Sequence, residues 1–128
     1  MRLLLDTCTF LWVIAGSADL STRSCALVSD PGNEVYLSVV SVWEIAVKHA
    51  LGRLPLPEPP RRFIAHQRAQ HGIQSLALDE EPALHLLALP EYHRDPFDRM
   101  LVCQAIAHGL TLLTPDPAVT QYPVPTVW

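Results

Sequence analysis

Apolar and polar residues alternate in blocks along the chain, and the first block predicts a buried strand that leads into a helix. Residues 2–5 form an apolar run after the opening arginine, as expected for a strand that a parallel sheet buries on both faces. Asp6 ends this run, and an apolar helix is expected over residues 8–15, closed by Gly16. This order of elements is typical of α/β folds.

The same alternation continues to the end of the chain. Further strands are expected at residues 35–37, 73–78, 110–113 and 124–128. Further helices are expected at residues 21–29, 41–52, 61–71, 79–89 and 95–109, with a short turn or helix after Pro117. This order predicts one α/β domain over residues 1–128, in which helices cover both faces of a parallel sheet. Folds of this class bind ligands at the carboxyl ends of the strands.

Acidic residues recur where predicted strands end and predicted helices begin. Asp6 and Asp116 each follow a strand, and Glu44 and Asp98 each lie in the first turn of a helix. We expect them at one edge of the sheet, where two bare charges about 4 Å apart would repel by about 4 kcal/mol at an effective dielectric constant of 20. A divalent cation removes this cost, and oxygen ligands favour Mg²⁺ or Mn²⁺. Such a site activates water for attack on a phosphate.

Each of these acids, taken alone, also fits a structural role. Ser41 and Glu44 match a capping box, in which Glu44 serves a backbone N–H. The run DPFD at residues 95–98 matches a helix cap followed by proline and an acid. Asp6 and Asp116 fit caps of the turns that follow them. Capping gives no reason for four acids to gather at one edge, so the set favours a metal site.

The composition of the chain excludes some classes of protein but does not identify the function. A chain of 128 residues with 49% hydrophobic and 17% charged residues fits one globular domain and excludes intrinsic disorder. Its three cysteines lack CxxC spacing, which argues against a disulfide framework or a zinc finger and for a reducing cytoplasm.

Targeting and charge add two further limits. Asp6 interrupts the apolar start, which argues against a signal peptide, and no apolar stretch approaches the length of a membrane span, so we expect a soluble protein without membrane contact. The net charge of −4 disfavours nucleic-acid binding by bulk electrostatics, but it is compatible with a nuclease whose carboxylates hold cations.

Four motifs occur in a characteristic order along the chain. They are LLLDT at residues 3–7, SVVSVWEIAVK at 38–48, HRDPFDRMLVCQA at 93–105 and LLTPDPAV at 112–119. Together they resemble the motifs of PIN domains, most of all those of the VapC-type toxins of bacterial toxin–antitoxin pairs. The resemblance covers nearly the whole chain. It implies a three-layer α/β/α fold with a central parallel sheet, metal-dependent cleavage of RNA, a toxin role and homodimers. It also implies a small antitoxin whose C-terminal segment covers the site.

Carried over residue by residue, the resemblance makes Asp6, Glu44, Asp98 and Asp116 the acids of the Mg²⁺ or Mn²⁺ site. Asp6 and Asp116 are then the principal ligands, while Glu44 and Asp98 hold the ion or its waters. Residues expected beside the site or in contact with RNA are Thr7, Ser38, Ser41, Lys48, Asp95, Arg99 and Thr114.

Several neighbouring residues have two interpretations. His93, Arg94 and Arg99 flank the acids and are candidates for contacts with RNA phosphates, but Asp95 and Arg99 also have the spacing of an ion pair on a helix. The tryptophans are expected to pack in the protein rather than to stack on bases. The apolar first helix suggests a surface for a second copy or a partner.

Two other function classes compete with the nuclease. A phosphatase would use Asp6 as its nucleophile, but such enzymes carry a second aspartate two residues later, where Cys8 stands here, and a lysine at a later strand end. A non-catalytic interaction domain would use the acidic pocket only for binding. Metal-stimulated turnover of RNA distinguishes the nuclease from both.

Overall fold

A five-stranded parallel sheet forms the centre of the structure, a computed structural model that describes residues 1–128. Its strands are β1 (Arg2–Leu5), β2 (Glu34–Ser38), β3 (Gln74–Leu76), β4 (Thr111–Leu113) and β5 (Thr126–Val127), in the spatial order β3-β2-β1-β4-β5. Leu5 at the end of β1 pairs with Leu37 on one side and Leu113 on the other. The carboxyl ends of the three central strands therefore meet at one edge, and the predicted parallel sheet is confirmed.

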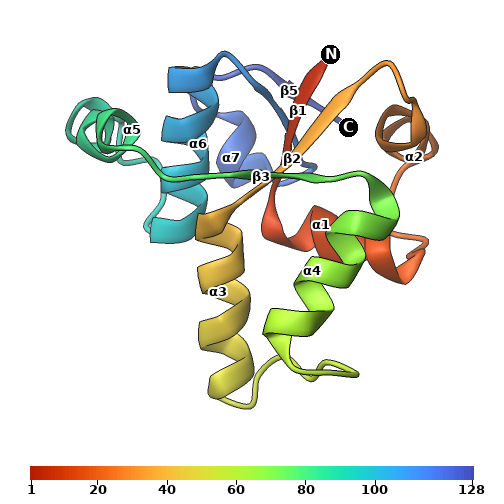
Figure 1. Cartoon of the computed structure of the whole chain (residues 1–128). Coiled ribbons are helices and arrows are strands. Elements are labelled where there is room, and N and C mark those ends of the chain that lie inside the picture. The colour runs from red at the N-terminus through yellow and green to blue at the C-terminus, as the bar shows by residue number, and fades with distance from the viewer.

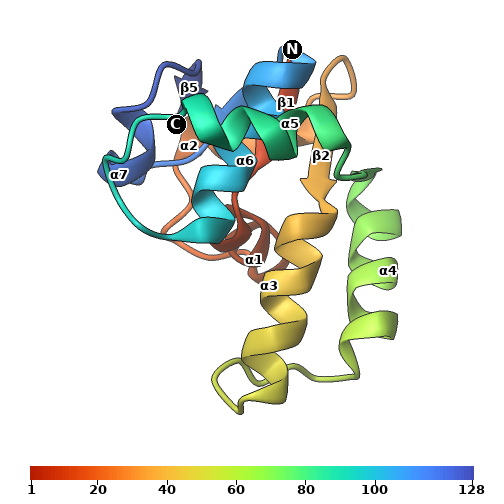
Figure 2. The same ribbon diagram turned by 90° about the vertical axis from the view of Figure 1, so that its left-hand side faces the viewer.

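Helices cover the sheet on both faces (Figure 1). They are α1 (Thr7–Ala15), α2 (Thr22–Ser29), α3 (Val39–Ala50), α4 (Pro60–His71), α5 (Glu80–His85), α6 (Pro96–His108) and α7 (Pro117–Thr120), and a 3₁₀ turn (Leu86–Ala88) follows α5. Figure 2 shows α3 and α4 extending side by side away from the sheet. None of the helices combines the length and the apolarity needed to cross a membrane.

The continuous apolar run of β1 is explained by two separate cores. Leu3 and Leu5 pack on one face with residues of α1, α3 and α4, while Leu4 packs on the other face with residues of α6 and α7. All three leucines are completely buried. Successive side chains of a strand point to opposite faces, so a strand covered on both sides needs apolar residues at every position. Each such burial contributes about 1.5–3 kcal/mol.

Helix α3 begins earlier than the sequence pattern indicated. Its cap is Ser38, whose hydroxyl oxygen accepts a hydrogen bond from the backbone N–H of Val40 at 3.0 Å. Strand β2 passes directly into this helix, so Glu44 is its sixth residue, in the second turn. The predicted capping box of Ser41 and Glu44 is therefore wrong, and Glu44 has no capping role.

The region between α4 and α6 also differs in detail. Strand β3 is shorter than predicted, and the helix expected over residues 79–89 divides into α5 and the 3₁₀ turn. The start of α6 follows the prediction, because the Asp95 carboxylate accepts hydrogen bonds from the backbone N–H groups of Phe97 and Asp98.

A completely buried glutamine holds these segments together. The Ser38 hydroxyl donates to Gln104 Oε1 at 2.5 Å, and Gln104 Nε2 donates to the carbonyl oxygen of Ala77 at 3.2 Å. This side chain links α6 to the start of α3 and to the segment after β3. Nothing in the sequence pattern of α6 distinguishes Gln104 from a solvent-facing residue.

Replacing Gln104 with alanine is expected to lower the free energy of unfolding by about 2–4 kcal/mol, because it leaves buried polar partners unpaired and opens a cavity. Urea denaturation measures this change. Gln70→Ala on the exposed side of α4 is the matched control and should change the free energy by less than about 0.5 kcal/mol. Equal effects of the two substitutions would contradict the assigned role of Gln104.

Candidate metal centre

A cavity of about 400 Å³ lies at the carboxyl ends of β1 and β4, and all four acids predicted from the sequence line it. Asp6 follows β1, Asp116 follows β4, and Glu44 and Asp98 come from α3 and α6. Asp95 is the fifth carboxylate in the lining, and Lys48 carries the one ammonium group there. The negative charge of the cavity therefore exceeds its positive charge.

Asp6 is held in place by hydrogen bonds to both oxygens of its carboxylate. Oδ1 accepts from the backbone N–H of Thr9 at 2.8 Å and caps α1, while Oδ2 accepts from the hydroxyl of Thr114 at 2.5 Å. Burial raises the pKa of Asp6 despite these bonds, and the nearby charge of Asp116 raises it further. Asp6 is thus both a helix cap and a buried acid under electrostatic strain.

The Thr114 hydroxyl connects Asp6 to Asp116. Besides donating to Asp6, it accepts a hydrogen bond from the backbone N–H of Asp116 at 3.1 Å. Asp116 Oδ1 in turn accepts from the N–H of Ala118 at 2.9 Å and caps α7. These bonds fix the two acids that follow the central strands relative to each other.

Glu44 lines the cavity from α3 and also has defined partners. The Thr7 hydroxyl donates to Glu44 Oε1 at 2.6 Å and lies 3.0 Å from the hydroxyl of Ser41. Lys48, one turn later on α3, donates to Glu44 Oε2, and this hydrogen bond raises the pKa of Lys48. Thr7, Ser41 and Lys48 therefore lie where the sequence placed them, beside the acids.

Asp98 shows most directly that the acids act on one another. Its pKa is raised to about 6, chiefly by burial and then by the charge of Asp95, with smaller contributions from Asp6 and Glu44. A hydrogen bond with His93 acts in the opposite direction. The charges of the neighbouring Asp95 and of two other segments, which carry Asp6 and Glu44, thus act on this carboxylate.

The PIN domain family matches residues 3–124 of this sequence. The chain belongs to this family. Over 69 residues it is 35% identical to ribonuclease VapC16 of Mycobacterium tuberculosis, a match that covers 54% of this chain and about half (49%) of VapC16. Over 129 residues it is 28% identical to ribonuclease VapC22 of the same species, covering 98% of this chain and 97% of VapC22.

A solved structure supports the fold of this PIN domain. The crystal structure of VapBC2 from Rickettsia felis, bound to a DNA fragment from its promoter, is similar to this chain with a TM-score of 0.75. The similarity covers 99% of this chain and 98% of that one, at 14% sequence identity. At this identity the similarity shows the fold alone, and it agrees with the predicted three-layer α/β/α architecture.

The acids of this PIN domain share a cavity without closing into a ligand set. No group of three or more histidine, cysteine, aspartate or glutamate side chains is positioned to hold a metal ion. The geometry therefore provides the donors and their supports, but not a completed coordination sphere.

One interpretation of the neighbouring residues is wrong, and the hydroxyl of Ser38 has partners other than the acids. Asp95 and Arg99 do not form an ion pair, because Asp95 caps α6 and Arg99 turns toward the carbonyl oxygen of Pro90 at 2.7 Å. The Ser38 hydroxyl makes no hydrogen bond with the acids, since it donates to Gln104 and caps α3.

Sequence reasoning missed some residues of the cavity and placed others less well. Cys8 and Trp12 line the cavity, and neither is among the residues expected beside the site. Trp12 packs edge-on against Trp128 at 5.8 Å between ring centroids, as expected. Trp43 contacts Phe97 but remains 60% exposed, so the packing prediction holds only in part.

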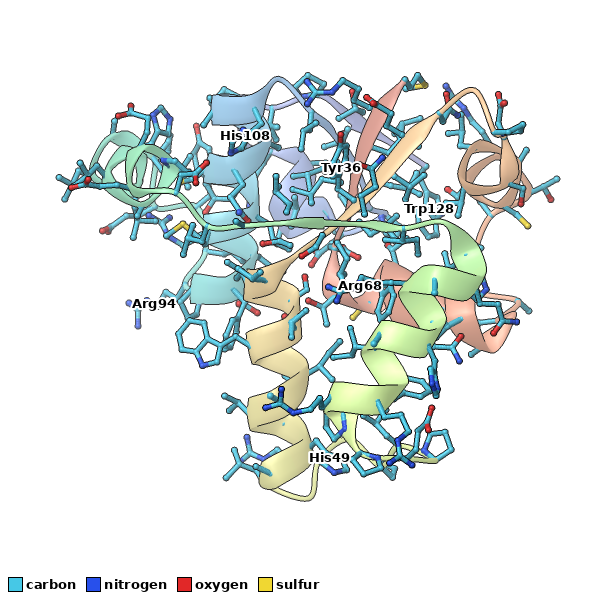
Figure 3. The ribbon with its side chains drawn as sticks, viewed as in Figure 1. Tyr36, His49, Arg68, Arg94, His108 and Trp128 are labelled. Atoms are coloured by element: carbon cyan, nitrogen blue, oxygen red, sulfur yellow. The ribbon has the colours of Figure 1, made fainter.

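The other basic and histidine side chains lie outside the cavity. Arg94 and Arg99 line a separate polar hollow with Glu91 and His93. Figure 3 shows Arg94 at the start of α6 and His49 at the far end of α3. The histidines therefore supply no ligands to the acidic cavity.

Replacing Asp98 with asparagine is expected to stabilise the metal-free protein at pH 8 by about 1–2 kcal/mol, less than the full value of the shift because Asp98 keeps some solvent contact. Its raised pKa means that the folded state holds the proton more tightly than the unfolded state. The stability this provides is present at low pH and is lost as pH rises through about 6. The gain from asparagine should therefore vanish at pH 4.

Urea denaturation at both pH values, with EDTA present, measures this difference. Glu81→Gln is the control, since Glu81 is exposed on α5 outside the cavity and should show no such pH dependence. A destabilisation by Asp98→Asn of equal size at pH 4 and pH 8 would show that no repulsion acts on Asp98.

Proposed function

We propose that this chain is a metal-dependent endoribonuclease, the toxin of a toxin–antitoxin pair, with Asp6, Glu44, Asp98 and Asp116 as its metal site. The observation that carries the proposal is the convergence of these acids, from four separate segments, on one cavity with a single ammonium group. Membership of the PIN domain family and the similarity to two VapC ribonucleases support it.

The donor set suits Mg²⁺ or Mn²⁺. The four acids offer only oxygen atoms, which these hard cations prefer. Burial raises the pKa values of Asp6 and Asp98, and the charges of neighbouring carboxylates raise them further. We infer that Asp6 and Asp116 would be the principal ligands, and that Glu44 and Asp98 would hold the ion or its waters.

The chain's own residues would prepare this site for phosphodiester hydrolysis. A bound Mg²⁺ or Mn²⁺ would supply activation of water and would offset charge on the phosphate oxygens. Thr114 holds one oxygen of Asp6, and Thr7 holds one oxygen of Glu44, so both carboxylates keep fixed directions. Lys48 is the one cation of the lining, and its half-exposed ammonium, which already pairs with Glu44, would also pair with a phosphate oxygen.

The remaining parts of the proposal concern the assembly and its setting. We propose one PIN-like domain over residues 1–128, a homodimer, a small antitoxin as partner and a cytoplasmic location. The half-buried apolar side chains of α1, which are Leu11, Trp12, Val13 and Ile14, support a partner surface. All three cysteines are free, which is typical of a reducing compartment.

Replacing Asp6 with asparagine is expected to reduce Mg²⁺-dependent RNA cleavage by at least about 100-fold, since a direct ligand should matter more than the outer partners that cost 10–100-fold. Asparagine caps helices about as well as aspartate, so α1 should still form. Cleavage of labelled RNA with Mg²⁺, with Mn²⁺ and with EDTA measures the change, and circular dichroism checks the fold. Glu81→Gln is the control outside the cavity.

Three outcomes would count against the nuclease. Cleavage by Asp6→Asn at the wild-type rate would remove Asp6 from the site, and full cleavage in EDTA would remove the metal. Phosphate release from a small phosphoester, without RNA cleavage, would favour the phosphatase.

A further inference from the structure

A polar cluster beside the candidate metal centre has no part in the proposed function so far. Its centre is the hydroxyl of Tyr122, a side chain that is 3% exposed. The hydroxyl accepts hydrogen bonds from the backbone N–H of His93 at 3.2 Å and from Arg99 Nη1 at 3.1 Å. It also lies 2.7 Å from His93 Nδ1. We call Tyr122, His93 and Arg99 the Tyr122 cluster.

The contacts of the Tyr122 hydroxyl determine which nitrogen of His93 carries a proton. The backbone N–H and the guanidinium are donors only, so together they occupy the two lone pairs of the phenolic oxygen. The hydroxyl proton must therefore point at His93 Nδ1, which accepts it. A ring whose Nδ1 is an acceptor carries its proton on Nε2.

The protonated nitrogen faces one of the four acids. His93 Nε2 lies 3.4 Å from Asp98 Oδ2, and both side chains are largely buried. Arg99 Nη1 also donates to the carbonyl oxygen of Pro90 at 2.7 Å, which fastens the loop before α6. The Tyr122 cluster thus joins this loop, α6 and the segment after α7. Its N–H group that faces Asp98 is the Nε2–H of His93.

We propose that His93 is a positioning residue for Asp98, with its Nε2–H directed at the carboxylate by the hydroxyl of Tyr122. The effect of this contact on metal binding rests on the proposed function. The bond engages Oδ2 and would leave Oδ1 as the oxygen of Asp98 without this partner to hold an ion. Partners that hydrogen-bond a ligating carboxylate affect metal affinity in this way.

The same contacts argue against a role of His93 in binding RNA phosphates. Both ring nitrogens are engaged within the protein, Nδ1 by Tyr122 and Nε2 by Asp98. Arg99 is engaged in the same manner by Tyr122 and Pro90. The histidine that flanks the acids in the sequence therefore builds the site rather than contacts its substrate, and Arg99 supports it through Nη1.

The first test measures the tautomer of His93 and needs no catalytic activity. Nitrogen-15 chemical shifts of the imidazole in metal-free protein at pH 8 should show the proton on Nε2 in wild type. Tyr122→Phe keeps the ring packing but removes the hydroxyl, so it should yield a mixture of tautomers. Tyr92→Phe is the matched control: Tyr92 is exposed, packs against Tyr122 and lies outside the cluster, and its replacement should change nothing. A wild-type ring protonated on Nδ1 would overturn the proposal.

The second test uses two substitutions of His93 that differ in the position of their amide group. The glutamine amide can reach the place of Nε2 and donate to Asp98, whereas the shorter asparagine amide reaches only the place of Nδ1. His93→Asn should weaken Mn²⁺ binding by about 10–100-fold, and His93→Gln should stay within about 3-fold of wild type. Isothermal titration with Mn²⁺ measures both affinities, and thermal melting checks that both variants fold.

Asp6→Asn, titrated in parallel, distinguishes failure of this inference from failure of the proposed function. If Asp6→Asn loses Mn²⁺ binding but His93→Asn binds as wild type does, the positioning role is wrong and the metal site stands. If Asp6→Asn binds Mn²⁺ as wild type does, the metal site is wrong, and the tautomer measurement alone decides the role of Tyr122. In cleavage assays of His93→Asn, excess Mn²⁺ should restore kcat, which a damaged fold would not allow.

Discussion

The burial of mutually repelling carboxylates at one end of the sheet is the constraint on which the rest of the site depends. The parallel register brings the ends of β1 and β4 together, and Asp6 and Asp116 follow those strands. Glu44 and Asp98 complete the lining from α3 and α6. Burial first, and then the charges of neighbouring carboxylates, raise the pKa values of Asp6 and Asp98. Buried carboxylates that repel one another destabilise a folded protein unless a positive charge offsets them, and a divalent cation is the simplest candidate.

Helix capping and metal binding are compatible roles of the same side chains. Asp6 caps α1 and Asp116 caps α7, each through one oxygen. Backbone N–H groups therefore hold the carboxylates at fixed places before any cation arrives. Asp95 is different, because its capping of α6 explains its position, and its charge then acts on Asp98. Capping explains where the carboxylates of Asp6 and Asp116 point. The position of all four acids around one cavity is what supports the proposed function.

The sequence predicts the features that depend on neighbouring residues. It does not predict contacts between residues that are far apart in the chain. The apolar run of β1 and the cap of α6 follow from neighbouring residues. Their order then places the acids at one edge, although their role as ligands stays a proposal. The start of α3 was misplaced because serines at 38 and 41 both fit a cap. His93 and Tyr122 are 29 residues apart in the chain, and no spacing or periodicity of the sequence predicts their contact.

A crystal structure of the protein soaked in Mn²⁺ tests the central claim most directly. Anomalous scattering from manganese would give the position of each ion independently of any assay. The account predicts density among Asp6, Glu44, Asp98 and Asp116, with oxygen ligands around it. Occupied manganese sites elsewhere on the protein, with none in this cavity, would contradict it.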